Sequence, residues 1–524
     1  MNSPAGQKLP YWWLYCTVFL TGASVMVIEL LGTRLIAPFY GASLYVWASL
    51  ISVTMIALAI GYYAGGHWAD HAKRTGLALI IALAGLLTLL IPWMTAPVLL
   101  ATDSLGLQMG TFTSTLILFT PSLIMLGMVG PFAVKLATDS LSGVGASTGS
   151  IYAVSTVGSV VGTLLLGFYL FPRIGSREIF VGVGLGLFVL ATLVAFFERK
   201  HISLRYSLIP VILLALPGVM LSPGGLSPSN AANLPANAVG HAAQPYQVRF
   251  ERESLYGWVR VLDNSVANMR LLMADASTIG AASISHGENL MTYQKIVELI
   301  PRLAPGIERA LLIGQGAGHM ATDLLQFGIT TDTIEIDPAV AEAAQNYFDF
   351  KPTGNHIIGD ARYEIRKLQG SYDLIILDVF TGGAEPVHLL TEETLQQIDD
   401  LLSKRGILAL NFVSFLDTGE NIALASVGKT LAQVFMHQLI FISELGVDFN
   451  DFIFIASQHP LRIEDEQLSR TQQAWLESRL LTIDNSRGLI LTDNFNPLEA
   501  LQTRKSEHYR QLIVETVGTS QFVR

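Results

Sequence analysis

The sequence predicts a multi-pass α-helical membrane domain followed by a doubly wound α/β domain, with a small β-rich module ahead of the second domain. Three observations predict this order. Hydrophobic residues make up 51% of the 524 residues, and charged residues only 14%. The charged residues are sparse before about residue 198 and common after about residue 248. Strand and helix patterns then alternate through the second half, which is typical of a parallel sheet.

Seven apolar runs are each long enough to cross a bilayer as a helix, which takes about 20 residues. These runs cover residues 12–35, 45–67, 77–100, 110–137, 148–172, 177–197 and 204–221. No small-residue cleavage site follows the first run, so we expect a retained first span rather than a removed signal peptide. Residues 1–222 are therefore predicted to form the membrane domain.

Four residues of the membrane domain carry specific expectations. Glu29 and Arg34 lie within or at the end of the first span, where ionisable groups are costly and usually paired or functional. Glu29 lies deeper, which makes it a candidate for a polar transport path or an interhelical partner, whereas Arg34 is expected near the interface. Gly158 and Gly162 have the small-residue spacing that lets two helices approach closely.

Residues 223–247 are rich in Pro, Gly, Ser, Asn and Ala and contain no charged residue, which predicts a flexible linker. Beyond the linker, residues 248–304 are predicted to form a small module. Its elements are short strands at 259–262 and 270–273 and a helix at about 290–303.

The domain predicted for residues 305–524 contains the alternating pattern. Apolar strands are expected at 310–313, 333–336, 356–358, 374–377 and 407–411, with amphipathic segments between most of them. Two further strands, at 437–443 and 452–457, are expected to close one edge of the sheet. The sequence therefore predicts a parallel, doubly wound sheet.

A glycine-rich turn follows the first of these strands. Gly314, Gly316 and Gly318 would permit a tight turn and let a ligand approach the backbone at a helix N-terminus. Glu335 follows Gly314 by 21 residues at the end of the next strand. At this distance an acid can accept hydrogen bonds from ribose hydroxyls, so the pair predicts a Rossmann-like nucleotide site.

The next two strands also end in acids, Asp360 and Asp378. The carboxyl ends of parallel strands line the ligand crevice in this architecture. Carboxylates in such positions are costly unless they are solvated or liganded. The repetition at three successive strand ends therefore favours a functional site over helix capping.

These blocks resemble the signature of the spermidine synthases. The resemblance rests on residues 314–318, 335–337, 359–361 and 372–378, and on Tyr293 and Gln294, which match the family's short tyrosine motif. It covers roughly residues 248–460. In the membrane half, residues 29–34, 38–41 and 61–70 resemble bacterial proteins that fuse transporter-like helices to a spermidine synthase.

The resemblance implies an aminopropyltransferase in which Asp378 orients and deprotonates an attacking amine such as putrescine. The amine would displace methylthioadenosine from decarboxylated S-adenosylmethionine. By the same resemblance Glu335 would hold the ribose, Asp360 and Ala361 the adenine side, and Tyr293 and Gln294 the acceptor. Spermidine synthases commonly form dimers, which implies a homodimer.

Two positions depart from the family pattern. Ala317 in the glycine loop and Thr381 after Asp378 stand where aspartates usually contact cationic amine groups, and Thr381 is still expected to contact the substrate. Each lost charge-assisted hydrogen bond is worth roughly 1.5 to 3 kcal/mol. Intact S-adenosylmethionine is therefore an alternative donor, for methyl transfer or sulfonium cleavage. A transporter with a nucleotide-sensing domain is a third hypothesis.

Three further residues could serve the alternative chemistry. His319, His388 and Arg362 could contact the carboxylate of intact S-adenosylmethionine, and either histidine could act as a base. Surface or capping roles are more usual for such histidines, and a helix-surface salt bridge is favoured for Arg362.

Composition limits the partners. A net charge of −10 argues against nucleic acid, whose phosphates require a basic surface. Cys16 is the only cysteine, so no intramolecular disulfide or cysteine-rich metal site can form, and we expect no metal. The expected partners are a small amine and the lipid bilayer.

The expected location is the cell's inner membrane, but two arguments on sidedness conflict. Basic residues fall in alternate loops that the positive-inside rule places in the cytoplasm together with the N-terminus. These residues are Lys73, Arg74, Lys135, Arg199, Lys200 and Arg205. Seven spans from that start would leave the catalytic domain outside, whereas adenosyl donors are made and kept in the cytoplasm. We favour the cytoplasmic side.

Overall fold

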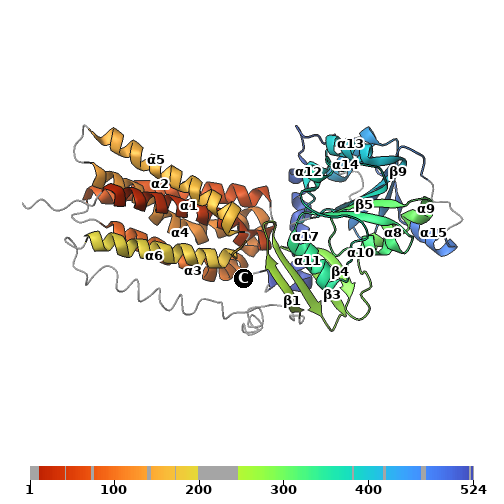
Figure 1. Ribbon diagram of the computed structural model, residues 1–524, viewed down its shortest axis with the longest axis horizontal. Coiled ribbons are helices and arrows are strands. Elements are labelled where there is room, and N and C mark those ends of the chain that lie inside the picture. The colour runs from red at the N-terminus through yellow and green to blue at the C-terminus, as the bar shows by residue number, and fades with distance from the viewer. Residues whose placement is uncertain are drawn as a thin grey trace, which may run out of the picture. The chain divides into compact units, whose positions relative to one another are not determined.

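A computed structural model describes residues 11–41, 43–71, 76–138, 143–171, 173–198, 246–380, 383–416, 421–461, 468–518 and 521–522. Two compact units make up the chain: Met1–Gly240 with Thr519–Arg524, and His241–Gly518. The first is helical and the second is an α/β unit (Figure 1). The exact boundaries at 222, 247 and 304 stay predictions.

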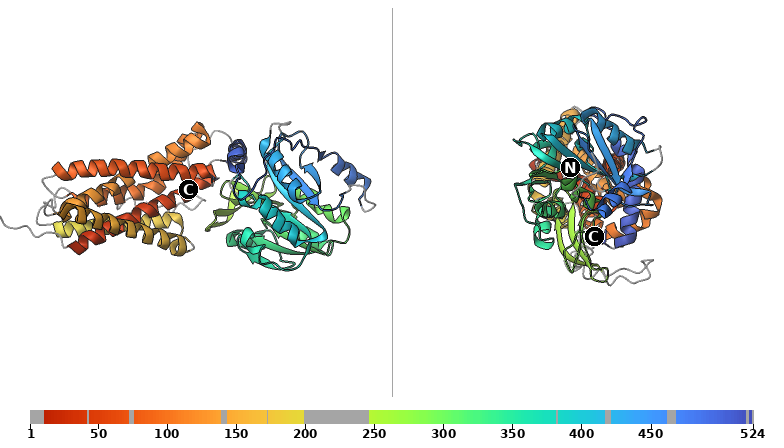
Figure 2. Two further views of the ribbon diagram at one scale, coloured as in Figure 1. Left: turned by 90° about the horizontal axis from the view of Figure 1, so that it is seen from above. Right: turned by 90° about the vertical axis from the view of Figure 1, so that its right-hand side faces the viewer.

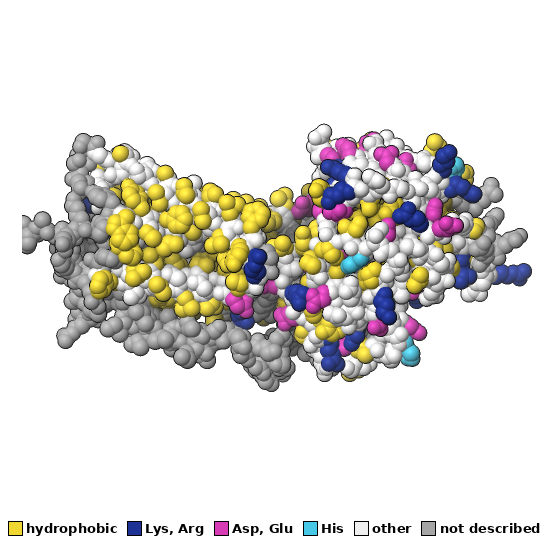
Figure 3. Space-filling model, viewed as in Figure 1, with side chains coloured by type: hydrophobic (Ala, Val, Ile, Leu, Met, Phe, Trp, Pro, Cys, Tyr) yellow, Lys and Arg dark blue, Asp and Glu magenta, His cyan; other side chains and the backbone are white. Residues whose placement is uncertain are grey.

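The helical unit contains six long α-helices in its described part. They are α1 (Tyr11–Tyr40), α2 (Leu44–His71), α3 (Leu77–Thr102), α4 (Gly106–Ala137), α5 (Val144–Leu165) and α6 (Ser176–Glu198). The extensive helix pairs are α2 with α4, α1 with α5, and α3 with both α4 and α6. Hydrophobic side chains cover the face of this unit seen in Figure 3, whereas acidic and basic side chains are scattered over the α/β unit.

Five apolar helical stretches in the described residues are long enough to cross a membrane. One of them, Leu77–Ala137, contains 61 residues and would be about 90 Å long as a single helix, three times the bilayer core. Instead it folds back as α3 and α4, which pack together. The turn is at Gly106, whose φ of 75° suits glycine. Six predicted runs thus match helices, and the run 204–221 lies outside the described residues.

Small residues bring α1 and α5 into close contact, as the spacing of Gly158 and Gly162 predicted. A Cβ added at Gly158 would lie 2.1 Å from the backbone oxygen of Phe19, and one at Gly162 would lie 2.9 Å from the Cα of Ala23. Either substitution would therefore push the two helices apart.

The two ionisable residues of α1 lie at different contacts. Glu29 is half-buried beside Thr54 of α2. Arg34 is half-buried, with its guanidinium carbon 5.1 Å from the centre of the Phe171 ring. A transport role for Glu29 and an interfacial position for Arg34 both stay predictions.

The α/β unit begins with a four-stranded antiparallel sheet. Its strands follow chain order: β1 (Tyr246–Glu253), β2 (Trp258–Asn264), β3 (Met269–Ala274) and β4 (Ser277–Ser283). The sequence pattern indicated only the two central strands, because β1 is rich in charge and β4 in small residues. One face of this sheet packs against the glycine loop and helix α11 (Pro338–Tyr347) through Val259, Leu272 and Ala282.

The main sheet has eight strands in the order β12-β10-β11-β9-β8-β5-β6-β7. The five neighbouring strands β9, β8, β5, β6 and β7 run parallel to one another. Strand β11 runs antiparallel to both of its neighbours, β9 and β10. The predicted doubly wound fold is therefore confirmed, with the last strands closing one edge. The bounds are β5 (Arg309–Ile313), β6 (Thr330–Glu335), β7 (His356–Ile358), β8 (Tyr372–Leu377), β9 (Leu402–Phe415), β10 (His437–Ile442), β11 (Phe449–Ser457) and β12 (Leu480–Leu481).

Helices cover both faces of this sheet (Figure 2). Alternate residues of β5 enter two separate cores, Leu311 and Ile313 on one face and Ala310 and Leu312 on the other. The first core is completed by α13 (Glu392–Leu401) and α14 (Ile422–Val434), and the second by α8 (Thr292–Glu298) and α10 (His319–Leu325). The other helices are α9 (Ile300–Leu303), α12 (Ala361–Glu364), α15 (Arg470–Glu477), α16 (Leu498–Leu501) and α17 (Thr503–Val517).

The helix predicted at 290–303 is in fact two short helices, α8 and α9. Pro301 stands in the first turn of α9, where a backbone N–H has no partner within the helix and its absence costs nothing. Proline could not continue α8, because its ring would clash with the preceding turn. The break leaves Tyr293 and Gln294 on a short helix of their own, and Tyr293 reaches the end of β8 from it.

Candidate active site

The glycine loop between β5 and α10 adopts a backbone that only glycine accepts readily. Gly314, Gly316 and Gly318 have φ values of 87°, 54° and 80°. A Cβ added at Gly314 would lie 2.0 Å from the backbone oxygen of Asp378, and one at Gly318 would lie 2.3 Å from the Phe350 ring. The loop is therefore pressed against the end of β8 on one side and the core on the other.

A cavity of about 370 Å³ opens at the carboxyl ends of the parallel strands. Eight residues singled out from the sequence line it: Tyr293, Gly314, Gly316, Glu335, Asp360, Ala361, Asp378 and His388. Gly318 and Gln294 support this wall without lining it. Thr381 lies outside the described residues, and Glu29 and Arg34 belong to the helical unit.

Glu335 is a buried carboxylate at the end of β6. It accepts hydrogen bonds from the backbone N–H groups of Gly316, at 3.3 Å, and Asp337, at 3.0 Å. Burial raises the pKa of Glu335 to about 7, although these hydrogen bonds oppose the shift. The side chain is thus fixed against the glycine loop, where it can accept hydrogen bonds from ligand hydroxyls.

Two other acids at the cavity wall are helix caps. Asp360 accepts a hydrogen bond from the Tyr363 N–H, at 2.9 Å, and caps α12. Asp337 accepts one from the Ala339 N–H, at 2.8 Å, and caps α11. Capping therefore accounts for part of the strand-end pattern, although both residues also line the cavity.

Asp378 lies at the centre of a hydrogen-bonded row. The Tyr293 hydroxyl donates to its Oδ2 at 2.7 Å, and the Asn411 amide donates to its Oδ1 at 3.0 Å. The Gln294 amide in turn donates to the Tyr293 hydroxyl at 3.0 Å and is held by Asn289. Burial raises the pKa of Asp378, and the bonds from Asn411 and Tyr293 lower it in part.

Three residues of this cavity region were missed by the sequence analysis. Asn411 and Asp451 line the cavity, and the Asp451 Oδ1 lies 3.5 Å from the Asn411 Nδ2. Burial, with the neighbouring charge of Asp378, raises the pKa of Asp451 to about 7. Asn411 could have been found by the strand-end rule, since it ends the strand predicted at 407–411. Asp451 directly precedes the strand predicted at 452–457.

Glu385, the third missed residue, forms a buried ion pair with Lys505 of α17. Its other partners are the Val413 N–H, at 2.9 Å, and the Gln502 amide, at 2.8 Å. Burial lowers the pKa of Lys505, while the Glu385 charge opposes that shift. This pair fixes α17 beside the cavity, where Tyr509 forms part of the wall.

Ala317, which replaces the family's aspartate, does not line the cavity. It is 4% exposed and packs against Gly280 of β4, where a Cβ would come within 2.6 Å of the Ala317 Cβ. The loop therefore presents no carboxylate to a bound ligand. No group of metal-ligating side chains of three or more occurs among the described residues.

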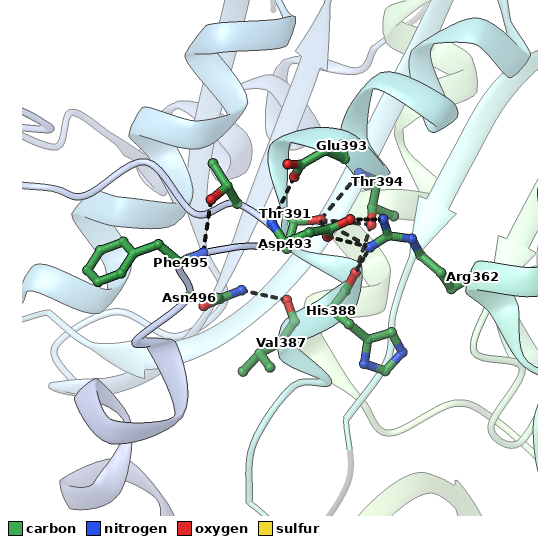
Figure 4. A network of polar contacts seen from close by, with 10 residues as sticks. Arg362, Val387, His388, Thr391, Glu393, Thr394, Asp493, Phe495 and Asn496 are labelled. Atoms are coloured by element: carbon green, nitrogen blue, oxygen red, sulfur yellow. Dashed lines mark hydrogen bonds and ion pairs between the residues drawn. The ribbon is translucent and has the colours of Figure 1, made fainter.

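The three residues considered for alternative chemistry are placed differently. Arg362 donates to both oxygens of Asp493, at 2.9 and 2.6 Å, and to the His388 carbonyl (Figure 4). Arg362 therefore forms a salt bridge, as favoured from the sequence. His388 has an exposed side chain at the cavity wall, turned away from this network. His319 is buried in α10, and neither ring nitrogen has a hydrogen-bond partner among the described residues.

Comparisons with known proteins find relatives that match part of the chain. No family model matches it. A polyamine aminopropyltransferase of Vibrio vulnificus is 30% identical over 213 residues, which are 38% of this chain and 71% of that protein. An N-terminal histidine N-methyltransferase of Emericella nidulans is 31% identical over 237 residues, which are 40% of this chain and only 41% of the relative.

Among solved structures, a spermidine synthase from Thermotoga maritima superposes with a TM-score of 0.36 at 17% identity, covering 46% of this chain and 95% of that one. The fold and cavity described above define an α/β protein with a cleft at its strand ends, and its relatives are transferases. The chain belongs to the polyamine aminopropyltransferase family.

Proposed function

We propose that the protein is a membrane-bound aminopropyltransferase that moves an aminopropyl group from decarboxylated S-adenosylmethionine to an amine such as putrescine. The observation that carries this proposal is the position of Asp378. It lines one cavity together with the glycine loop and Asp451, and Tyr293 and Asn411 hold it there.

The donor's nucleoside would occupy the end of the cavity formed by β5, β6 and β7. Gly314 and Gly316 have no side chain, so the donor could approach their backbone closely. Glu335 is positioned to accept hydrogen bonds from the ribose hydroxyls. Asp360 and Ala361 line the adenine side of this pocket. The family resemblance and the relative from Vibrio vulnificus support the choice of an adenosyl sulfonium donor.

The acceptor amine must lose a proton before or during attack. Asp378 would take that proton, and its raised pKa brings a carboxylate closer to the basicity that the step requires. A carbon–nitrogen bond forms as the carbon–sulfur bond breaks. The sulfur keeps the electron pair, and methylthioadenosine leaves.

A methyltransferase or lyase acting on intact S-adenosylmethionine is the second candidate. Two observations favour it: the loop carries Ala317 instead of an acid, and the relative from Emericella nidulans is a methyltransferase. With no loop carboxylate, the carboxylate of intact S-adenosylmethionine would meet less repulsion.

One assay separates the candidates. The detergent-purified full chain is incubated with either donor, with and without putrescine, and the nucleoside product is identified. We expect methylthioadenosine only with the decarboxylated donor and putrescine together. S-adenosylhomocysteine would establish methyl transfer instead, and methylthioadenosine without an acceptor would establish cleavage. Donor binding without any product would contradict both and favour the nucleotide-sensing transporter.

Asp378→Asn tests the proposed base. The variant should lower kcat by about 10² to 10⁴ and leave the affinity for methylthioadenosine unchanged, because only proton transfer is removed. Retention of full turnover would exclude Asp378 from this role.

The six described helices of the first unit are apolar and long enough to span a membrane. We propose that this unit lies in the inner membrane and that the α/β unit faces the cytoplasm. Access to an adenosyl donor requires that side.

A further inference from the structure

Asp451 is a cavity carboxylate that the protein itself leaves poorly compensated. It lies at the third position of β11, opposite Val413 of β9 in the antiparallel register. Its side chain has only long contacts, 3.5 Å to Asn411 and 3.4 Å to Ser443. Protein hydrogen bonds are normally about 2.7 to 3.2 Å long. Among the described residues, no cation forms an ion pair with Asp451.

The charges around Asp451 are predominantly negative. Asp378 and Glu385 both raise the pKa of Asp451, in addition to the effect of burial. The ammonium of Lys505 contacts Glu385 instead. When Asp451, Asp378, Glu385 and Lys505 are all ionised, the carboxylates in this neighbourhood outnumber the cations by two. A carboxylate removed from water in such surroundings is costly unless a cationic ligand compensates it.

Asn411 lies between Asp451 and the proposed base. Its single amide nitrogen contacts Asp378 at 3.0 Å and Asp451 at 3.5 Å, so the two carboxylates lie within the span of a short aliphatic diamine. The described residues that directly follow Asp378 at the end of β8, Val379 and Phe380, carry no second carboxylate. The antiparallel strand β11 thus supplies a carboxylate that the segment after the parallel strand lacks.

Resting on the function proposed above, we propose that Asp451 binds the second ammonium group of the acceptor and thereby selects diamines over monoamines. One nitrogen of the diamine attacks beside Asp378. The other stays protonated and pairs with Asp451. A monoamine of equal length would leave Asp451 uncompensated and would bind more weakly.

The test is equilibrium binding to the detergent-purified full chain, measured by calorimetry with methylthioadenosine present. Putrescine and n-butylamine are titrated into the wild type, Asp451→Asn and Asp448→Asn. Asp448 is exposed three residues earlier, so its variant removes the same charge outside the cavity. We expect Asp451→Asn to weaken putrescine binding about ten- to hundredfold, as loss of one charge-assisted hydrogen bond predicts. Butylamine affinity should change less than about twofold in either variant.

Turnover provides the second readout. Asp451→Asn should raise the KM for putrescine while largely retaining kcat, whereas Asp378→Asn should lose kcat and still bind putrescine. Asp451→Glu, which keeps the charge, should recover part of the preference for the diamine. Unchanged methylthioadenosine affinity shows that each variant is folded.

Several results would overturn the proposal. Equal loss of putrescine and butylamine binding would show a structural role, and a rise in the donor KM alone would assign Asp451 to the donor's own ammonium. Wild type that binds neither amine would also overturn it. If the wild type forms no methylthioadenosine but its diamine preference depends on Asp451, the proposed reaction fails and this inference stands. If the wild type does form methylthioadenosine but Asp451→Asn keeps the same preference for the diamine, the proposed reaction stands and this inference fails.

Discussion

Glu335 combines two roles that pull its protonation in opposite directions. Burial favours the neutral acid, whereas a ligand's ribose hydroxyls would favour the carboxylate as an acceptor. The backbone N–H groups of Gly316 and Asp337 already point at its two oxygens, so the carboxylate is prepared before any ligand arrives. We therefore expect the proposed nucleoside binding to depend on pH through this residue.

We expect the affinity for methylthioadenosine to rise as the pH rises through about 7, the raised pKa of Glu335, and to level off above it. Below that pH the acid is protonated, and a neutral carboxyl is a weaker hydrogen-bond acceptor than a carboxylate. Glu335→Gln should bind about ten- to hundredfold more weakly, from about 1.5 to 3 kcal/mol, and should lose the pH dependence. Calorimetry across this range checks both, with exposed Glu308→Gln as the control.

The stability of the ligand-free unit should change in the opposite direction. Because the folded pKa of Glu335 lies above its ordinary value of 4.5, the folded state holds a proton that the unfolded chain has lost between these pH values. Its contribution to stability is complete below 4.5 and is lost as the pH rises towards about 7. Urea titrations of wild type and Glu335→Gln, compared across that window, isolate this contribution; an identical pH dependence would contradict it.

At the scale of elements, the glycine loop is positioned by contact with β8 rather than by its own sequence. Gly314→Ala should abolish nucleoside binding and destabilise the α/β unit, because the new Cβ would meet the Asp378 carbonyl at 2.0 Å. Gly306→Ala is the matched control: its φ is 96° but nothing lies within 4 Å of the added Cβ. The control should lower the free energy of unfolding by only about 1 to 2 kcal/mol, the strain of alanine in a left-handed backbone conformation. Thermal unfolding with and without methylthioadenosine compares the two, and equal effects would refute the contact argument.

Helix α17 is joined to the cavity by the buried pair of Lys505 and Glu385. Lys505→Met should lower the free energy of unfolding by about 3 to 5 kcal/mol, since it leaves Glu385 buried and unpaired. Adding Glu385→Leu should recover part of this loss. Urea titration measures both changes, and exposed Lys404→Met serves as the control. A single variant as stable as the wild type would contradict the role of the pair.

At the scale of the whole molecule, the number of membrane crossings decides which side the α/β unit faces. The α3–α4 turn makes the described helices six, an even number, so crossing of the proposed membrane by each of them would bring the end of α6 to the side where α1 begins. Lys135 ends α4 on that same side, which the positive-inside rule places in the cytoplasm.

Alkaline phosphatase and green fluorescent protein fused after Glu198 and after Arg524 determine the topology. We expect cytoplasmic signals at both positions, fluorescence without phosphatase activity, because the donor is cytoplasmic. A fusion after Asp103, which follows the opposite end of α3, provides the periplasmic control. If the reporters fused after Glu198 and after Arg524 gave signals from opposite sides, the run 204–221 would cross the membrane.

The sequence alone determined the order of the two halves, the doubly wound sheet and the residues at its strand ends. These features are periodic or local: apolar runs, glycine at turns, and acids at fixed spacing. Eight of the residues singled out from the sequence do line one cavity. The two outer strands of the small sheet escaped notice because charged and small residues carry little hydrophobic pattern.

Which distant groups share that cavity depends on how the chain folds. Asp451 and Tyr509 reach it from an antiparallel strand and a C-terminal helix, and no spacing along the chain relates them to Asp378. Ala317, conspicuous in the sequence, proved to pack against Gly280 outside the cavity. Strand order and register bring side chains together across long stretches of chain, and the balance of charge in a buried site depends on those contacts rather than on local pattern.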